Sequence, residues 1–150
     1  MKKISLTLRF GLVISAILIA YFLILALFNL HTNPVFSFFN AIITAFGIYE
    51  VVRLSKLEQP DSFSYGEGFK IGLTTGAIAT ILFTAFFLLY STEINADFLP
   101  QLLNSMNGSF NINEGLIAFI VAIMGFVTTI VSTLVVMQLF KNSRNMTQNK

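Results

Sequence analysis

The residues with most potential for chemistry are polar groups inside otherwise apolar stretches of the sequence. Asn40 is the only carboxamide well inside such a stretch. An amide in hydrocarbon needs a hydrogen-bond partner, so we expect Asn40 to face a neighbouring helix and to stabilise the structure. A role in transport or ligand binding is the alternative. The candidate partners at a matching depth are Ser15, Thr80, Thr84 and Thr129.

Glu50 is the only acidic residue inside one of these apolar stretches. An unpaired acid at the centre of a bilayer is costly, so such residues are candidates for function. However, Glu50 lies near the end of its stretch, and Arg53 follows three residues later, on the same helix face. An ion pair at the membrane interface therefore accounts for Glu50. A protonatable or ion-binding group is the alternative.

Small residues recur at every fourth position of one stretch, at Gly68, Gly72, Gly76, Thr80 and Thr84. Another stretch carries a looser series that includes Gly125 and Thr129. Small side chains let two helix backbones approach closely, which is how helices associate in lipid. We expect the two series to pack against each other within the chain. The alternative is a homo-oligomer, or a membrane-protein partner, bound through the stripe of Gly68, Gly72 and Gly76.

Other kinds of chemistry lack the residues they need. The sequence has no cysteine, which excludes disulfides and thiolate sites. The single histidine, His31, has no second metal-binding residue near it, so we expect a surface histidine and no metal. No nucleophile with a base, phosphate-binding loop or basic cluster for nucleic acid is recognisable. We therefore expect a non-enzymatic protein that has no cofactor and binds no nucleic acid.

The composition places these residues in a membrane protein. Hydrophobic residues make up 55% of the 150 residues and charged residues 11%, against about 25% charged in an average soluble domain. So few charges cannot cover the surface of a soluble fold of this size. We expect the first apolar stretch to be a retained helix, because its apolar run is longer than that of a cleaved signal peptide. Four stretches are long enough to cross a bilayer as helices, at 10–30, 35–54, 70–90 and 115–140.

The predicted fold is therefore a single all-α membrane domain over residues 1–150, a bundle of four transmembrane helices. The connection 91–114 contains apolar residues at every fourth position from Phe98. We expect a short amphipathic helix at 97–105 on the outer membrane face, which either caps the bundle or binds a ligand or partner. The polar tail 141–150 is expected to be mobile.

The orientation follows from the basic residues. All nine Lys and Arg residues precede the first span, lie in or beside the middle connection, or follow the fourth span, and the other two connections have none. With four spans, these three basic regions lie on one side of the membrane. Basic residues are enriched on the cytoplasmic side, so we expect both termini in the cytoplasm and membrane lipid as a partner.

Three short sequence runs resemble a known family. They are Ser62-Phe-Ser-Tyr-Gly-Glu-Gly-Phe-Lys-Ile-Gly-Leu-Thr-Thr-Gly76, Asn95-Ala-Asp-Phe-Leu-Pro100 and Gly125-Phe-Val-Thr-Thr-Ile-Val-Ser132. In these runs the chain is similar to an uncharacterised membrane family, domain of unknown function 4199, which is found chiefly in Bacteroidetes. The resemblance implies four spans and a bacterial inner membrane. It implies no activity and no functional residues.

Two functional classes remain open. The first is a non-enzymatic membrane subunit or scaffold that binds a partner or lipid, since the spans contain few polar groups and the connections are short. The alternative is a small transporter or channel component. It would act as an oligomer, because four spans with so few polar residues do not line a pathway by themselves.

Overall fold

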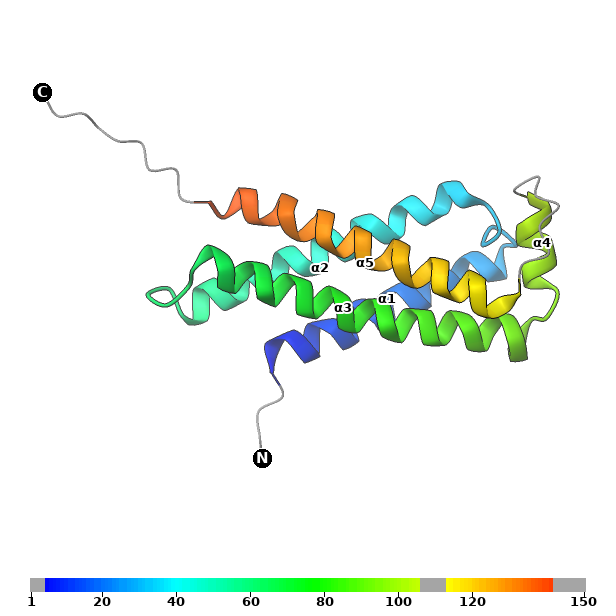
Figure 1. Ribbon diagram of the computed structural model, residues 1–150, viewed down its shortest axis with the longest axis horizontal. Helices are drawn as coiled ribbons and strands as arrows, with labels where there is room; N and C mark the ends of the chain where they lie inside the picture. Colours follow the sequence, from blue (N-terminus) through cyan, green and yellow to red (C-terminus); the bar gives the residue numbers. More distant parts are fainter. Residues whose placement is uncertain (1–4, 106–112, 142–150) are drawn as a thin grey trace, which may run out of the picture.

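The computed structural model describes residues 5–105 and 113–141, and every regular element within these ranges is helical. Four long helices run up and down in one bundle: α1 (Leu6–Leu27), α2 (Ser37–Glu58), α3 (Tyr65–Leu89) and α5 (Glu114–Leu139) (Figure 1). Each forms a segment long and apolar enough to cross a membrane. The expected all-helical fold with four membrane-spanning helices is confirmed at this level.

Three short elements join the long helices. A 3-10 turn at Pro34–Phe36 leads into α2, and a π-helical turn at Tyr90–Ile94 ends α3. α4 (Phe98–Ser105) follows and lies across one end of the bundle (Figure 1). A helix is therefore present where the sequence predicted one at 97–105. The end of the bundle at which α4 lies is called the α4 end below. Residues 142–150, with the mobility predicted for them, lie outside the described residues.

The helix starts follow from side-chain caps in the sequence. Ser64 Oγ accepts a hydrogen bond from the backbone N–H of Glu67 at 3.2 Å, and Asn113 Oδ1 accepts one from Leu116 at 2.8 Å. Such caps satisfy the free N–H groups of the first turn. Because of its cap, α3 begins at Tyr65 instead of 70. Hydropathy marks only the apolar part of a helix, and the helix itself continues into the polar residues.

α1 ends earlier than the predicted span 10–30. Asn29 adopts a φ of 56°, and the backbone N–H of Leu30 bonds to the carbonyl of Leu25 at 2.9 Å. A left-handed residue with this backbone bond is a common way for a helix to end, and asparagine adopts that conformation more readily than most residues. The connection to α2 is therefore longer than the gap between the predicted spans 10–30 and 35–54.

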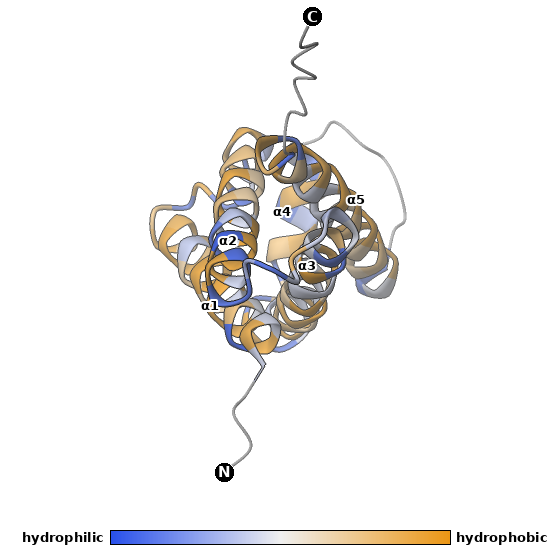
Figure 2. Cartoon of the chain, turned by 90° about the vertical axis from the view of Figure 1, so that its left-hand side faces the viewer, coloured by the Kyte–Doolittle hydropathy of each residue, from blue (hydrophilic) through white to orange (hydrophobic). Residues whose placement is uncertain are grey.

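The core consists of three groups of buried apolar residues. The group at the α4 end is rich in aromatic rings and contains Phe22, Phe87, Tyr90, Phe98, Leu99 and Ile117. The group at the opposite end contains Ile48, Val51, Val52, Val136 and Met137. A smaller group between them contains Ile14, Leu18 and Ala79. The outward faces of the long helices are apolar as well, as expected for a surface in contact with lipid (Figure 2).

Candidate functional site

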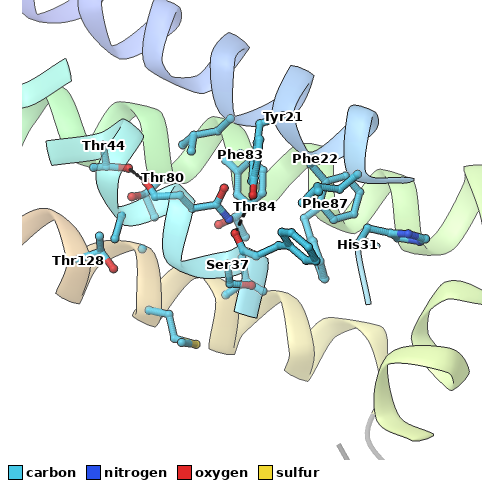
Figure 3. Close-up of a pocket in the computed structure, with 18 of the residues that line it drawn as sticks. Tyr21, Phe22, His31, Ser37, Thr44, Thr80, Phe83, Thr84, Phe87 and Thr128 are labelled. Carbon is cyan, nitrogen blue, oxygen red and sulfur yellow. Dashed lines mark hydrogen bonds between the residues drawn. The ribbon is translucent and has the colours of Figure 1, made fainter. Parts of the chain in front are cut away.

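A cavity of about 230 Å³ lies inside the bundle, in the half nearer to α4. All four long helices and α4 contribute to its wall, which is mostly apolar. No Asp, Glu, Lys or Arg occurs among its described wall residues. The polar wall residues are Tyr21, His31, Asn33, Ser37, Asn40, Thr44, Thr80, Thr84 and Thr128, most of which Figure 3 labels.

The cavity lies where α2 and α5 do not pack against each other, since their close contact is in the other half of the bundle. Away from α4, a Cβ at Gly47 would collide with the side chain of Ile14 on α1. In the same half, Val51 and Val52 of α2 are fully buried in a cluster with Met137 of α5. Toward α4, α2 and α5 diverge (Figure 1). Their facing side chains there line the cavity instead of closing on each other.

Unpartnered polar atoms are concentrated around this cavity. Within the described part of the chain, five buried side-chain N or O atoms have no hydrogen-bond partner. Four of them belong to cavity residues: Asn40 Oδ1, Thr84 Oγ1 and both ring nitrogens of His31. The fifth is Thr75 Oγ1, outside the cavity wall. An unmade hydrogen bond in a buried place costs about 1–3 kcal/mol, so the residues around this cavity carry an energetic cost that the rest of the described chain largely avoids.

Asn40 does not form the helix-to-helix bond that its sequence position suggested. Its amide oxygen has no partner among the described residues. Of the predicted partners, Ser15 donates to Leu12 of its own helix at 2.8 Å, and the Thr80 hydroxyl lies 3.5 Å from that of Thr129. The expected bond is absent because α2 is separated from α3 and α5 by the cavity at this level.

Two other polar side chains of the cavity wall are engaged with backbone. Tyr21 of α1 donates from Oη to the carbonyl of Phe36 at 3.0 Å, which ties the start of α2 to α1. Thr44 donates to the carbonyl of Asn40 at 2.8 Å, within α2 (Figure 3). These two hydroxyls are therefore saturated as donors. The cavity residues that keep a buried polar atom without a partner are Asn40, Thr84 and His31.

His31 lies in the aromatic cluster of the α4 end, and the expectation of a surface histidine is wrong. Its ring stacks on Phe98 with centroids 4.9 Å apart and planes at 16°, and it meets Phe22 edge-on at 5.7 Å. Burial lowers the pKa of His31, because the charged imidazolium loses hydration there. α4, which is distant in sequence, lies over the turn that contains His31. The sequence around His31 alone does not predict this contact.

α4 closes the cavity at its end of the bundle. Phe98 and Leu102 are part of the cavity wall, and Phe98 is only 1% exposed. Ser105 donates from its hydroxyl to the carbonyl of Thr32 at 3.0 Å, which ties α4 to the connection between α1 and α2. Phe98 and Leu102, two of the apolar residues of this helix, thus point into the bundle.

Glu50 and Arg53 lie outside the cavity, in the half of the bundle away from α4. Arg53 Nη1 lies 3.3 Å from Glu50 Oε2, and the Arg53 side chain is half exposed. The ion pair between them is present, and no group of three His, Cys, Asp or Glu residues that could hold a metal ion occurs in the described residues.

The small-residue stripe of α3 faces α5 inside the chain. A Cβ at Gly72 would lie 2.7 Å from Thr133 Cγ2, and a Cβ at Gly68 would lie 2.8 Å from Met137 Sδ. A Cβ at Gly76 would collide with Thr129. Since real Cβ contacts are longer, glycine is what permits this close approach of the two helices.

A glycine of α5 also permits the close approach of α3 and α5. A Cβ at Gly125 would lie 2.5 Å from Thr80 Cγ2. Two further close approaches were missed by the sequence reasoning, at Gly11 against Ile78 of α3 and at Gly47 against Ile14. Gly11 and Gly47 are not part of a repeat of small residues, whereas the glycines of α3 are. The sequence therefore gives no signal for these two close approaches.

Comparison with known proteins identifies a family without a described activity. Residues 9–142 match the family described as Protein of unknown function (DUF4199). No curated protein and no solved structure matches the chain.

Proposed function

Because the chain belongs to the DUF4199 family of proteins of unknown function, we propose its function from its own geometry. It is a non-enzymatic multi-pass membrane protein that binds a small lipid-like molecule of the bilayer in the intramembrane cavity. The observation that carries this proposal is the largely apolar cavity of about 230 Å³ inside the bundle, whose described wall residues include neutral polar side chains and no Asp, Glu, Lys or Arg. Apolar pockets with a few convergent polar groups are the usual form of small-molecule sites.

The cavity volume fits such an occupant. A cavity of about 150 Å³ lined by apolar side chains accepts benzene. The cavity of about 230 Å³ has room for a larger group, such as a segment of an acyl chain with a small headgroup. Rings of Phe22, Phe83 and Phe87 line it and supply apolar surface for the occupant.

The proposed orientation places the α4 end on the outer face of a bacterial inner membrane and both termini in the cytoplasm. The nine basic residues of the sequence support it, because all belong to the segments that precede α1, join α2 to α3, or follow α5, or to the adjoining helix ends. The connections at the α4 end carry the acids Glu93, Asp97 and Glu114 instead. A reporter active only outside the cytoplasm, fused after Lys150, should be silent, and activity there would contradict the orientation.

In a scaffold role, the protein would bind a partner in addition to the lipid. A homo-oligomer or membrane-protein partner that used the stripe of Gly68, Gly72 and Gly76 would have to displace α5, because Met137, Thr133 and Thr129 occupy that face. A partner at the lipid-facing outer surface needs no such rearrangement. The apolar outer faces of the helices support the second arrangement.

Ligand binding is tested by stabilisation. A ligand that binds only the folded state at a concentration of 100 Kd raises the free energy of unfolding by about 2.7 kcal/mol. We expect single-chain oleoyl lipids, added to the detergent-purified full chain, to raise its melting temperature. The effect should be lost in Ala41→Phe, which places a ring in the cavity, and kept in Ala85→Phe, which places it on the lipid-facing side of α3. Equal stabilisation of both variants would contradict the site.

Transport is the second candidate, and the three threonines in the cavity wall, Thr44 of α2, Thr80 of α3 and Thr128 of α5, favour it. Such a role would require an oligomer to complete a pathway. Proton or solute flux into liposomes, compared between the wild type, Asn40→Leu and Glu50→Gln, separates the two functions. Absence of flux in the wild type would remove transport.

A further inference from the structure

His31 is the only histidine in the sequence, and both of its ring nitrogens are buried at the α4 end. Neither nitrogen has a hydrogen-bond partner among the described residues. A neutral imidazole has one N–H donor, whereas an imidazolium has two and no acceptor site. The described structure thus offers no acceptor to the second proton, and it holds the neutral ring.

Aromatic rings from three elements surround His31. Phe22 of α1 and Tyr90 of the π-helical turn meet it edge-on, with ring centroids 5.7 and 6.1 Å away, and Phe98 of α4 stacks on it at 4.9 Å. A cation on the face of Phe98 would gain a cation–π contact. An ion buried without a partner loses more hydration energy than this contact returns. Burial accordingly lowers the pKa of His31.

The titratable groups near this end do not compensate a proton on the buried ring. Glu93, Asp97 and Glu114 are the acids there, and among the described residues none lies within ion-pair distance of His31. Tyr90 and, from α1, Tyr21 add phenols, which carry no charge at acid pH. The connections at this end contain no Lys or Arg. A hydrated imidazolium would therefore lie among acids, which favour its charge.

α4 is attached to the bundle by few side chains. Its eight residues are fewer than the roughly 12–15 that an isolated helix needs in water, so its order depends on contacts with the bundle. Its buried residues are Phe98 and Leu99. The Ser105 hydroxyl lies 3.0 Å from the carbonyl of Thr32 but 2.7 Å from a carbonyl of α4 itself, and its single proton is shared between them. The stack of Phe98 on His31 is thus part of a small apolar attachment.

The same residues form the wall of the cavity at this end. His31, Phe98 and Leu102 all line it, and His31 lies close to Phe22 there (Figure 3). Movement of α4 would remove two of these wall residues. Water and a proton reach the buried nitrogens of His31 only when the side chains around the ring, Phe98 among them, have moved. The proton therefore binds to the open arrangement and stabilises it.

We propose that α4 is an acid-released lid: protonation of His31 displaces Phe98 from its ring, α4 leaves the end of the bundle, and the cavity opens there. As a control of lipid binding, this role of α4 rests on the proposed function, whereas the movement of α4 needs no lipid. The closed chain holds the neutral ring and the open chain takes the proton. The ratio of open to closed chain should therefore rise up to tenfold for each pH unit below about 6.5, the ordinary histidine value.

The movement is tested by a distance between two spin labels, since the sequence has no cysteine that would compete for them. Gln101→Cys labels the exposed side of α4, and Ile24→Cys labels an exposed position of α1. Ile24→Cys with Leu116→Cys is the matched control, because it joins two long helices at the same end. The full-length chain is measured in phosphatidylcholine nanodiscs between neutral pH and about pH 5, which lies above the ordinary range of carboxyl groups.

We expect a second, longer distance between positions 101 and 24 to appear toward about pH 5 and to grow several-fold, while the control pair keeps its distance. His31→Phe retains an aromatic ring but takes no proton, so α4 should stay closed at both pH values. Phe98→Ala should release α4 at both. Three results would overturn the lid: no longer distance in the wild type, equal growth in His31→Phe, or the same change in the control pair.

Control of the lipid site is measured separately, by the transfer of bound, radiolabelled monooleoylglycerol to added vesicles. This lipid has no titratable group. Transfer should be several-fold faster at about pH 5 than at neutral pH in the wild type, and equal at both in His31→Phe. Movement of α4 without faster transfer would overturn its role as a lid over the cavity. Absence of bound lipid at neutral pH would overturn the proposed function, and the movement of α4 would stand.

Discussion

Replacing Gly76 by alanine tests the close contact between α3 and α5. The new Cβ would lie 2.6 Å from Thr129 Oγ1 and 2.9 Å from Thr129 Cβ, whereas carbon atoms in contact lie about 3.5–4.0 Å apart. Thr129 is fully buried, and its carbonyl accepts the Thr133 hydroxyl at 2.7 Å, so it has little freedom to move.

The expected loss of stability follows from this overlap. The helices must separate by about 1 Å to restore normal contacts. Overpacking of this kind costs about 1–3 kcal/mol. Alanine in place of glycine returns up to about 1 kcal/mol of helix propensity. We therefore expect Gly76→Ala to lower the free energy of unfolding by about 1–2 kcal/mol.

The assay is unfolding in mixed micelles, with helix content followed as the denaturing detergent is increased. Gly66→Ala is the matched control, because nothing lies within 4 Å of a Cβ at this exposed position of α3. It should be neutral or stabilising. Thr129→Ala should relieve most of the cost of Gly76→Ala, since it removes Cγ2 and Oγ1. The reasoning is refuted if Gly76→Ala is no more destabilising than Gly66→Ala, or if its cost is unchanged by Thr129→Ala.

Three further predictions concern α4, His31 and Glu50. Phe98→Ala should destabilise the α4 end by about 3–5 kcal/mol, as for other buried aromatic side chains, and should speed amide exchange in α4 more than in α2. Burial lowers the pKa of His31, so the unfolded chain binds more protons than the folded one below pH 6.5, the ordinary histidine value. The contribution of His31 to the free energy of unfolding is therefore full above that pH and is lost as the pH falls through the folded-state pKa. Melting temperatures should show this decline in the wild type and not in His31→Phe. Glu50→Gln should change the free energy of unfolding by less than about 1 kcal/mol, because its partner Arg53 is half exposed, and a larger effect would indicate a role beyond the ion pair.

The fold was predictable because its main features are local. Runs of apolar residues predicted four spans, and the caps at Ser64 and Asn113 set where two of the helices begin. The period-four glycines of α3 predict a close-packing face, and α5 lies against that face. These signals are all carried by neighbouring residues of one helix.

The site was predictable only in part, because it depends on the angle between helices. The sequence singles out Asn40 as the unusual residue, but its amide oxygen lacks a partner because α2 and α5 diverge, which no local pattern encodes. His31 was misplaced for a similar reason: Phe98, distant in sequence, stacks on it. Thr84 was recognised as a possible partner for Asn40, whereas the two together line a cavity.

The central claim, a lipid in the intramembrane cavity, is tested most directly by native mass spectrometry of the full chain released from detergent. The wild type and Ala85→Phe should each carry the mass of one bound single-chain lipid, and Ala41→Phe, with its ring in the cavity, should carry none. The same bound mass on Ala41→Phe as on the wild type would contradict the account.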